Sequence, residues 1–129
     1  MNGQSRNEVS IESPFTVRAS CLAGQGLCAT RSISVGQKIE YFEGYEIDHP
    51  TGYSLTFNGI RIEPTGSLRF LNHSCSPNAF FVDRELTALR DIDAGEEITI
   101  DYLATESEIS KRFKCECGSK KCRDWIGDR

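Results

Sequence analysis

The chain has 129 residues, 38% hydrophobic and 26% charged, which is the size and composition of one globular domain. Its net charge of −4 argues against a broad nucleic-acid-binding surface and suits a basic protein substrate. No apolar run approaches the roughly 20 residues that cross a bilayer, so no membrane association is expected. The polar first residues show no secretory signal, so an intracellular location, nucleus or cytoplasm, is expected.

The first part of the chain predicts a flexible tail followed by a strand. Residues 1–13 are polar, whereas Phe15 to Ala19 is rich in residues that favour β-structure. Gly24 and Gly26 come next, spaced by one residue. Glycine permits both a tight turn and the close approach of a ligand, and the bare Gly-x-Gly pattern is more often a turn than a site.

Short strands separated by turns are expected through the middle of the chain. A turn at Ser34–Gln37 precedes a strand from Lys38 to Ile47. Segments 53–57 and 59–63 then flank Asn58-Gly59, a dipeptide typical of two-residue hairpin turns. The pattern therefore favours a mostly-β fold.

The same alternation of strands and turns continues toward the C-terminus. Segments 79–83 and 86–92 predict a second hairpin around Arg84-Glu85, and a strand is expected from Glu97 to Tyr102. Glu106 to Phe113 fits one or two helical turns with Ile109 and Phe113 on one face.

The stretch from Arg69 to Asn78 has no helix or strand period. It reads Arg-Phe-Leu-Asn-His-Ser-Cys-Ser-Pro-Asn, which predicts a short helical turn leading into an irregular loop. Such a density of hydrogen-bonding groups points to a functional loop. Two later segments stand out with it: Gly-Glu-Glu-Ile-Thr-Ile-Asp-Tyr at 95–102 and Cys-Glu-Cys-Gly-Ser-Lys-Lys-Cys at 115–122.

Three of the six cysteines lie within this last segment, at Cys115, Cys117 and Cys122. Tetrahedral zinc needs four ligands, and clustered thiolates suit it. Free thiols, or a disulfide between Cys115 and Cys122, are the alternatives. Cys21 and Cys28 have no such spacing and are expected to be buried free cysteines.

Together, the three stretches resemble the signature of SET-domain protein lysine methyltransferases with a post-SET zinc motif. The resemblance covers about residues 15–127 and implies a SET fold, with small β-sheets, a knot-like C-terminal segment and short helices. It divides the chain into a tail (1–13), a SET domain (14–104), and a post-SET helix and zinc-binding segment (105–129). The chain carries no pre-SET cysteine cluster, so it is similar to the minimal members of the family.

The sequence departs from the family at one point. The family usually has Glu-Tyr-x-Gly-Glu where this chain has Glu-Tyr-Phe-Glu-Gly at 40–44, one residue longer. No catalytic role is assigned there, and its aromatic residues, Tyr41 and Phe42, are expected in the core. The family's variable insert, which often reads the substrate, is nearly absent.

The resemblance implies a structural zinc ion and a bound S-adenosylmethionine. The zinc would be held by the three C-terminal cysteines and by Cys75 of the central loop, with Lys120 and Lys121 offsetting the negative charge. The residues expected at S-adenosylmethionine are Gly24, Gln25, Gly26, Leu27, Arg69, Asn72, His73 and Trp125. A structural hydrogen-bonding role remains open for His73, and bracing of the fold is favoured for Arg69.

The resemblance also implies the catalytic groups. Tyr102 would orient the amine and the methyl group, because a phenol with a pKa near ~10 is a poor base at neutral pH. Tyr53 would line the lysine channel, the alternative being a Tyr packed at a sheet edge. Ile100 stands where part of the family has Phe or Tyr, so di- or trimethylation is expected.

The expected function is therefore S-adenosylmethionine-dependent protein-lysine N-methylation, with a histone tail, by default histone H3, or another basic protein as substrate. A homodimer could complete the substrate groove. The alternatives are a catalytically silent SET module that binds a protein partner and a purely structural zinc-stabilised domain. Binding of S-adenosylmethionine separates the last from the other two.

Overall fold

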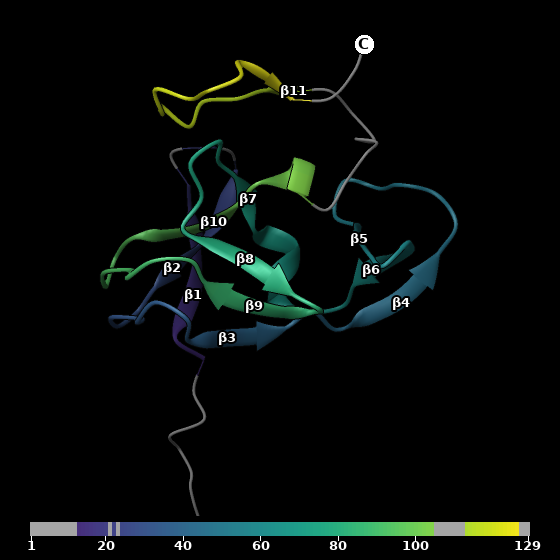
Figure 1. Ribbon diagram of the computed structural model, residues 1–129, viewed down its shortest axis with the longest axis horizontal. Coiled ribbons are helices and arrows are strands. Elements are labelled where there is room, and N and C mark those ends of the chain that lie inside the picture. The colour runs from purple at the N-terminus through teal and green to yellow at the C-terminus, as the bar shows by residue number, and fades with distance from the viewer. Residues whose placement is uncertain (1–12, 21, 23, 105–112, 127–129) are drawn as a thin grey trace, which may run out of the picture.

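The computed structural model describes residues 13–20, 22, 24–104 and 113–126, built from short strands and two 3-10 turns (Figure 1). No helix in these residues is long and apolar enough to cross a membrane. The mostly-β class is thereby confirmed. The predicted tail at 1–13 lies outside the described residues except for Ser13, and so does Cys21.

A four-stranded sheet brings the first strands of the chain together with strands from its middle and from near residue 100. Its order is β1 (Phe15–Ala19), β2 (Gln25–Ala29), β10 (Glu97–Ile100) and β7 (Asn72–His73). Strand β10 pairs antiparallel with β2 and parallel with β7, which sets Asn72 opposite Thr99 and His73 opposite Ile100. This pairing brings the central loop beside the segment that ends at Tyr102.

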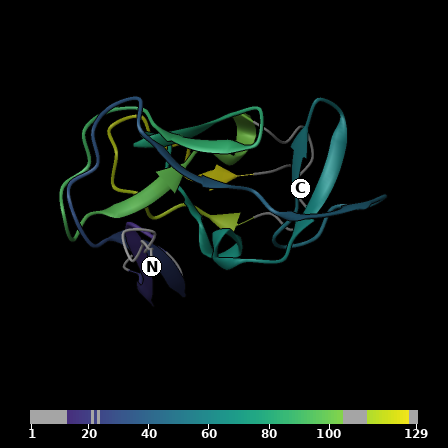
Figure 2. The ribbon, with the colours of Figure 1, turned by 90° about the horizontal axis from the view of Figure 1, so that it is seen from below.

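Two three-stranded sheets complete the core. One has the order β3 (Lys38–Tyr41), β9 (Glu85–Ala88) and β8 (Ala79–Val82), and the other β4 (Gly44–Ile47), β6 (Ile60–Pro64) and β5 (Leu55–Phe57). The sheet of β4, β6 and β5 lies at one end of the molecule in both views (Figures 1 and 2). Rings of Phe42, Phe57 and Phe81 meet between these two sheets, with centroids 5.1–5.6 Å apart.

The strand predicted from Lys38 to Ile47 is broken in two, because the chain changes sheets within it. Phe42 is fully buried and its backbone N–H donates to the carbonyl of Arg84, whereas Gly44 already pairs with β6. A Cβ at Gly44 would lie 2.1 Å from the carbonyl oxygen of Glu63, so only glycine fits there. The core prediction is confirmed for Phe42 and wrong for Tyr41, which is 40% exposed.

Both predicted hairpins are present. Asn58 and Gly59 have φ of 51° and 81°, as a two-residue turn of this type requires. The second turn is shifted by one residue, because Asp83 takes the positive φ of 58° and Glu85 already belongs to β9. Strand β9 ends at Ala88, and Ile92 makes an isolated bridge with Ile33.

The two 3-10 turns flank the central loop and its neighbour. The turn expected before the loop is η2 (Ser67–Phe70). The strand predicted to reach Tyr102 ends at Ile100, and Tyr102 begins η3 (Tyr102–Ala104).

The C-terminal segment forms a layer of its own, drawn in yellow in Figure 1. Strands β11 (Phe113–Lys114) and β12 (Trp125–Ile126) pair antiparallel and enclose the cysteine-rich turn. The predicted helix at 106–113 lies outside the described residues except for Phe113, which belongs to β11, so the helical assignment of that residue is wrong. Fully buried Ile126 anchors the layer.

Candidate functional site

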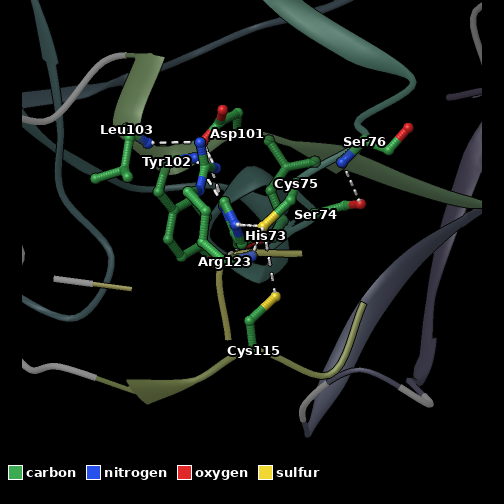
Figure 3. Close-up of polar contacts among 10 residues, drawn as sticks. His73, Ser74, Cys75, Ser76, Asp101, Tyr102, Leu103, Cys115 and Arg123 are labelled. Atoms are coloured by element: carbon green, nitrogen blue, oxygen red, sulfur yellow. Dashed lines mark hydrogen bonds and ion pairs between the residues drawn. The ribbon is translucent and has the colours of Figure 1, made fainter. Parts of the chain in front are cut away.

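Tyr102 stands where β10 ends and η3 begins, and both of its ends are held. Its hydroxyl donates to the carbonyl oxygen of Leu71 at 2.7 Å. Its backbone N–H donates to Nδ1 of His73 at 3.0 Å (Figure 3). Its ring packs against those of His73 and Phe113, with centroids 5.3 and 5.9 Å away. The phenol is therefore fixed in direction and close to the chain that leads into the central loop.

The electrostatic setting of Tyr102 keeps its hydroxyl protonated. Burial, with a smaller contribution from the carboxylate of Glu97, raises the pKa of Tyr102 to about 12. A phenol in this state donates a hydrogen bond and does not accept a proton at neutral pH. The structure thus favours a positioning role over a general-base role.

The side chain of His73 is turned inward. It is 4% exposed, and burial is the main reason why its pKa falls to about 4; nearby Arg123 also lowers the pKa, and Asp101 opposes the shift. Nδ1 faces the Tyr102 amide, and Nε2 lies 3.3 Å from Sγ of Cys75. The ring is accordingly neutral and points away from the surface, so only the backbone of His73 is left to meet a ligand.

Asn72 and Glu97 lie over the glycine-rich turn at the start of β2. The Asn72 amide nitrogen donates to the carbonyl of Gln25 and to Oε2 of Glu97, both at 2.9 Å. The other carboxylate oxygen of Glu97 accepts from the hydroxyl of Ser20 at 2.7 Å. A Cβ at Gly26 would lie 2.3 Å from Oε2 of Glu97, so the close approach expected of this glycine is made by protein groups.

The four predicted zinc ligands come together. The Sγ atoms of Cys75, Cys115, Cys117 and Cys122 all lie within 4.8 Å of one another, and Cys75 and Cys115 are buried. A tetrahedron with Zn–S bonds of about 2.3 Å has sulfur–sulfur edges of about 3.8 Å. The Cys75–Cys115 separation of 4.0 Å is close to that value, so these residues fit a structural zinc ion.

The charges around the cluster also fit a cation. Burial raises the pKa of Cys115 to about 12. At Cys117 burial acts in the same direction, but backbone N–H groups of Cys75 and Ser119 and the neighbouring thiols outweigh it and lower the pKa to about 6. Four adjacent thiolates would repel one another, so the thiols cannot all ionise without a positive centre among them.

Backbone and side-chain donors tie the cluster to the segment around Tyr102. The N–H of Arg123 donates to Sγ of Cys75 at 3.3 Å, and its guanidinium donates to Oδ1 of Asp101 at 2.8 Å. The same Asp101 oxygen accepts from the N–H of Leu103 at 3.0 Å. Figure 3 shows these groups arranged around the His73 ring.

The remaining predicted residues occupy several surroundings. Leu27 and Ile100 are buried in the main core, so Leu27 can offer a ligand only its backbone. Tyr53 is 51% exposed in the turn before β5, and Trp125 is 47% exposed. Arg69 is exposed, with its guanidinium carbon 5.1 Å from the centre of the Phe70 ring. Cys28, predicted to be buried, is a free cysteine but only half-buried.

Sequence reasoning did not single out Glu97, Asp101, Phe113 or Arg123. Glu97 belongs to the Gly-Glu-Glu motif. The alternation of polar and apolar residues along β10, which pairs with β2, was a usable signal for the face on which its side chain lies. Asp101 belongs to the same motif at 95–102. Phe113 and Arg123 carry no local signal, because their contacts join segments far apart in the chain: Phe113 packs on His73 and Tyr102, and Arg123 reaches Asp101.

Comparison with known proteins gives a consistent assignment. The sequence model of the SET domain matches residues 24–103. A histone-lysine N-methyltransferase of Fusarium mangiferae, specific for H3 lysine 9, is 37% identical over 48% of this chain and 24% of its own length. One of Yarrowia lipolytica, specific for H3 lysine 36, is 32% identical over 82% of this chain and 17% of its own length. The chain thus spans a quarter or less of the length of these relatives.

Solved structures show the same fold. The methyltransferase domain of human histone-lysine N-methyltransferase SETMAR superposes with a TM-score of 0.71 at 22% identity, covering 88% of this chain and 58% of that one. KRYPTONITE, solved in complex with mCHH DNA, an H3(1-15) peptide and SAH, gives a TM-score of 0.71 at 22% identity and covers 88% of this chain and 29% of its own.

Proposed function

The chain belongs to the SET-domain family, and on this premise we propose that it is an S-adenosylmethionine-dependent protein-lysine N-methyltransferase. Relatives from several organisms are histone-lysine N-methyltransferases, and the four-cysteine cluster fits the zinc motif that the family resemblance implies. The observation that carries the proposal is the fixed phenol of Tyr102, which lies beside the Asn72–His73 strand.

The proposed reaction places simple demands on this site. S-adenosylmethionine, held beside Asn72 and the Gly24–Leu27 turn, would supply an electrophilic methyl group for transfer to the lysine nitrogen. The lysine must react as the neutral amine, since an ammonium has no lone pair. The substrate ammonium therefore loses a proton to water before the methyl transfer. An apolar channel favours the neutral amine by desolvation. Tyr102, protonated at neutral pH, orients the reacting groups, and positioning can lower the barrier by several kcal/mol.

The surface between Gly24 and Asn72 is the proposed cofactor site. The NH2 group of Asn72 is turned toward Gln25 and Glu97, which points its carbonyl oxygen the other way, as binding of the cofactor ammonium requires. The carboxylate of Glu97, hydrogen-bonded to Asn72, would supply negative charge near a cationic cofactor. The backbone of Gly24–Leu27 and His73 would contact the rest, Trp125 would cover the adenine, and Arg69 would brace the loop or face the carboxylate.

The proposed substrate is a histone tail, with H3 as the first candidate, or another basic protein segment. The net charge of −4 supports attraction of Lys- and Arg-rich segments, and a neighbour in the structural comparison was solved with an H3 peptide. A nuclear or other intracellular location follows from this choice of substrate. The proposal does not include direct binding to nucleic acid. It does include a homodimer, in which the second copy would complete the substrate groove.

Tyr53 and Ile100 would shape the lysine channel. Ile100 is 2% exposed and lies two residues before Tyr102. Its branched aliphatic side chain has no hydroxyl to hold a water molecule beside the amine, so the proposed product range extends to di- and trimethyl-lysine. Mass spectra of a substrate peptide that stop at monomethyl-lysine under excess cofactor would contradict this.

The test is transfer of labelled methyl groups to core histones and to a mixed lysate by the wild-type chain and by Tyr102→Phe. Tyr45→Phe is the matched control, because Tyr45 is 58% exposed on β4. Labelling of H3 that is lost in Tyr102→Phe and kept in Tyr45→Phe supports enzyme and substrate together. Labelling of other lysate proteins alone keeps the enzyme and rejects the histone. Cofactor binding without any labelling favours a silent binding module instead.

A further inference from the structure

The imidazole of His73 is the one buried titratable group that the proposed reaction does not use among the residues that the structure describes around Tyr102. Its ring lies between Tyr102 and Phe113, with centroids 5.3 and 6.0 Å away, and these neighbours fix its plane. Each of its two nitrogens faces a different partner. The question is therefore what this ring connects.

The first contact decides where the proton sits. The backbone N–H of Tyr102 can only donate, and it points at Nδ1 at 3.0 Å, so Nδ1 must present a lone pair. The proton of the ring then lies on Nε2. Nε2 is 3.3 Å from Sγ of Cys75, which makes the second contact a hydrogen bond donated to the sulfur.

The sulfur that receives this bond is one of the four clustered cysteine atoms. It also accepts the backbone N–H of Arg123 at 3.3 Å. Donors of this kind are typical around metal-bound thiolates, because they disperse negative charge and hold the ligand in its orientation. The same His73 ring thereby reaches from a metal ligand to the backbone of the residue that the proposed mechanism depends on.

We propose that His73 is a positioning residue that couples the zinc-binding cluster to Tyr102, with Nε2–H bonded to Cys75 and Nδ1 bonded to the Tyr102 amide. The inference rests on the proposed function for its consequence in catalysis. The hydroxyl of Tyr102 is held by Leu71 and its backbone by His73, so the ring controls the start of η3 and with it the angle of the phenol. Loss of the metal would then disturb the reaction centre through this ring.

Two substitutions separate the two contacts. In His73→Asn, the side-chain oxygen takes the place of Nδ1 and keeps an acceptor for the Tyr102 amide, but nothing reaches Cys75. In His73→Gln, the amide nitrogen takes the place of Nε2 and keeps a donor for Cys75, but the acceptor for Tyr102 is gone. His49→Gln is the control, since the side chain of His49, the other histidine, is 69% exposed.

Three measurements report on the two contacts without any methyl transfer. A fourth measurement reports on their effect on methyl transfer. The first two are the sulfur-to-metal charge-transfer band of the protein loaded with Co²⁺ and the rate of zinc release to a chelator. The third is hydrogen exchange of the Tyr102 amide by NMR. The fourth is kcat and KM for methyl transfer.

We expect His73→Asn to shift the Co²⁺ band and to release zinc about tenfold faster, with the Tyr102 amide still protected. We expect His73→Gln to leave the band in place, to expose the Tyr102 amide and to lower kcat about tenfold with KM nearly unchanged. Identical behaviour of the two variants in band, zinc release and amide exchange would overturn the proposal. If the wild type transfers no methyl group, the proposed function fails, while the first three measurements still decide the coupling.

Discussion

The β-core and the C-terminal layer are stabilised in different ways. Among the residues that the structure describes, the core buries 17 hydrophobic residues in one cluster, from Phe15 to Ile100. The layer of β11 and β12 has a buried cluster of three, of which two are the cysteines Cys75 and Cys115 and the third is Ile126. A cluster of that size cannot offset the entropy of ordering the segment, so a cross-link of another kind is required.

The difference divides the site into a part built on a large apolar core and a part built around four cysteines. Cys75 belongs to the core loop and the other three cysteines to the layer, so one bound ion would join both. Asp101 and Arg123 make a second, weaker connection at the same place, since exposed ion pairs contribute little. Tyr102 lies between these connections, where any loosening of the layer reaches the phenol.

The largest effect should follow removal of the metal. Structural zinc contributes about 10–16 kcal/mol of apparent binding energy in small zinc peptides, so its loss should release the layer. We expect Cys115→Ser, or treatment of the wild type with a chelator, to abolish methyl transfer while the thermal transition of the β-core persists. Circular dichroism and methyl-transfer assays check this, with Cys28→Ser as the control. Unfolding of the core together with zinc loss would show that the two regions are not separable.

A cavity in the core should destabilise the β-core and leave the C-terminal layer unaffected. Leu86 is fully buried in β9, and truncation of such a residue costs about 2–5 kcal/mol. We expect Leu86→Ala to lower the free energy of unfolding of the core in urea by about 3 kcal/mol. The rate of zinc release from the folded protein should stay at the wild-type value, and a marked acceleration would break the comparison.

The matching cavity in the layer is Ile126→Ala. Ile126 is also fully buried, but its neighbours are cysteines and Phe113 rather than the main core. We expect about 2 kcal/mol of local destabilisation, seen as faster zinc release rather than as a lower core transition. A loss of core stability as large as that of Leu86→Ala would place Ile126 in the core.

The pH dependence of the free energy of unfolding tests the burial of Tyr102 between the two regions. Its pKa of about 12 in the fold exceeds the value near 10 of an unfolded chain, so the folded protein keeps the proton between these pH values. The stability from this group is therefore complete below pH 10 and declines as the pH rises toward 12. At pH 11 the wild type should have lost about 1 kcal/mol relative to its value at pH 9, a loss absent from Tyr102→Phe. Urea titrations at the two pH values measure it, and equal losses in both proteins would mean that the phenol is solvated.

Local patterns were sufficient for several elements. Strand β1 has the predicted bounds, and the Asn58-Gly59 turn has the backbone angles that its residues favour. These features depend on neighbours along the chain. The strand from Lys38 to Ile47 was mispredicted because its break at Phe42 depends on partners in two other sheets.

The candidate site divides in the same way. The spacing of Cys115, Cys117 and Cys122 and the motif around Asn72 and His73 were visible in the sequence, together with Tyr102. The direction in which each side chain points was not. That the His73 ring faces Cys75 rather than the surface follows from the parallel pairing of β7 with β10, which no local pattern encodes.

The sequence by itself determined the family, the mostly-β class and the group of Cys115, Cys117 and Cys122, because each depends on residue types at fixed short spacings. The resemblance to the family implied Cys75 as the fourth member of the cysteine set. Only the tertiary structure decided that Glu97 lies over Gly26, that Arg123 reaches Asp101, and that the ring of His73 meets the backbone of Tyr102. The physical reason is that these contacts join segments 22 to 71 positions apart, and their geometry is set by strand pairing and burial of the whole chain.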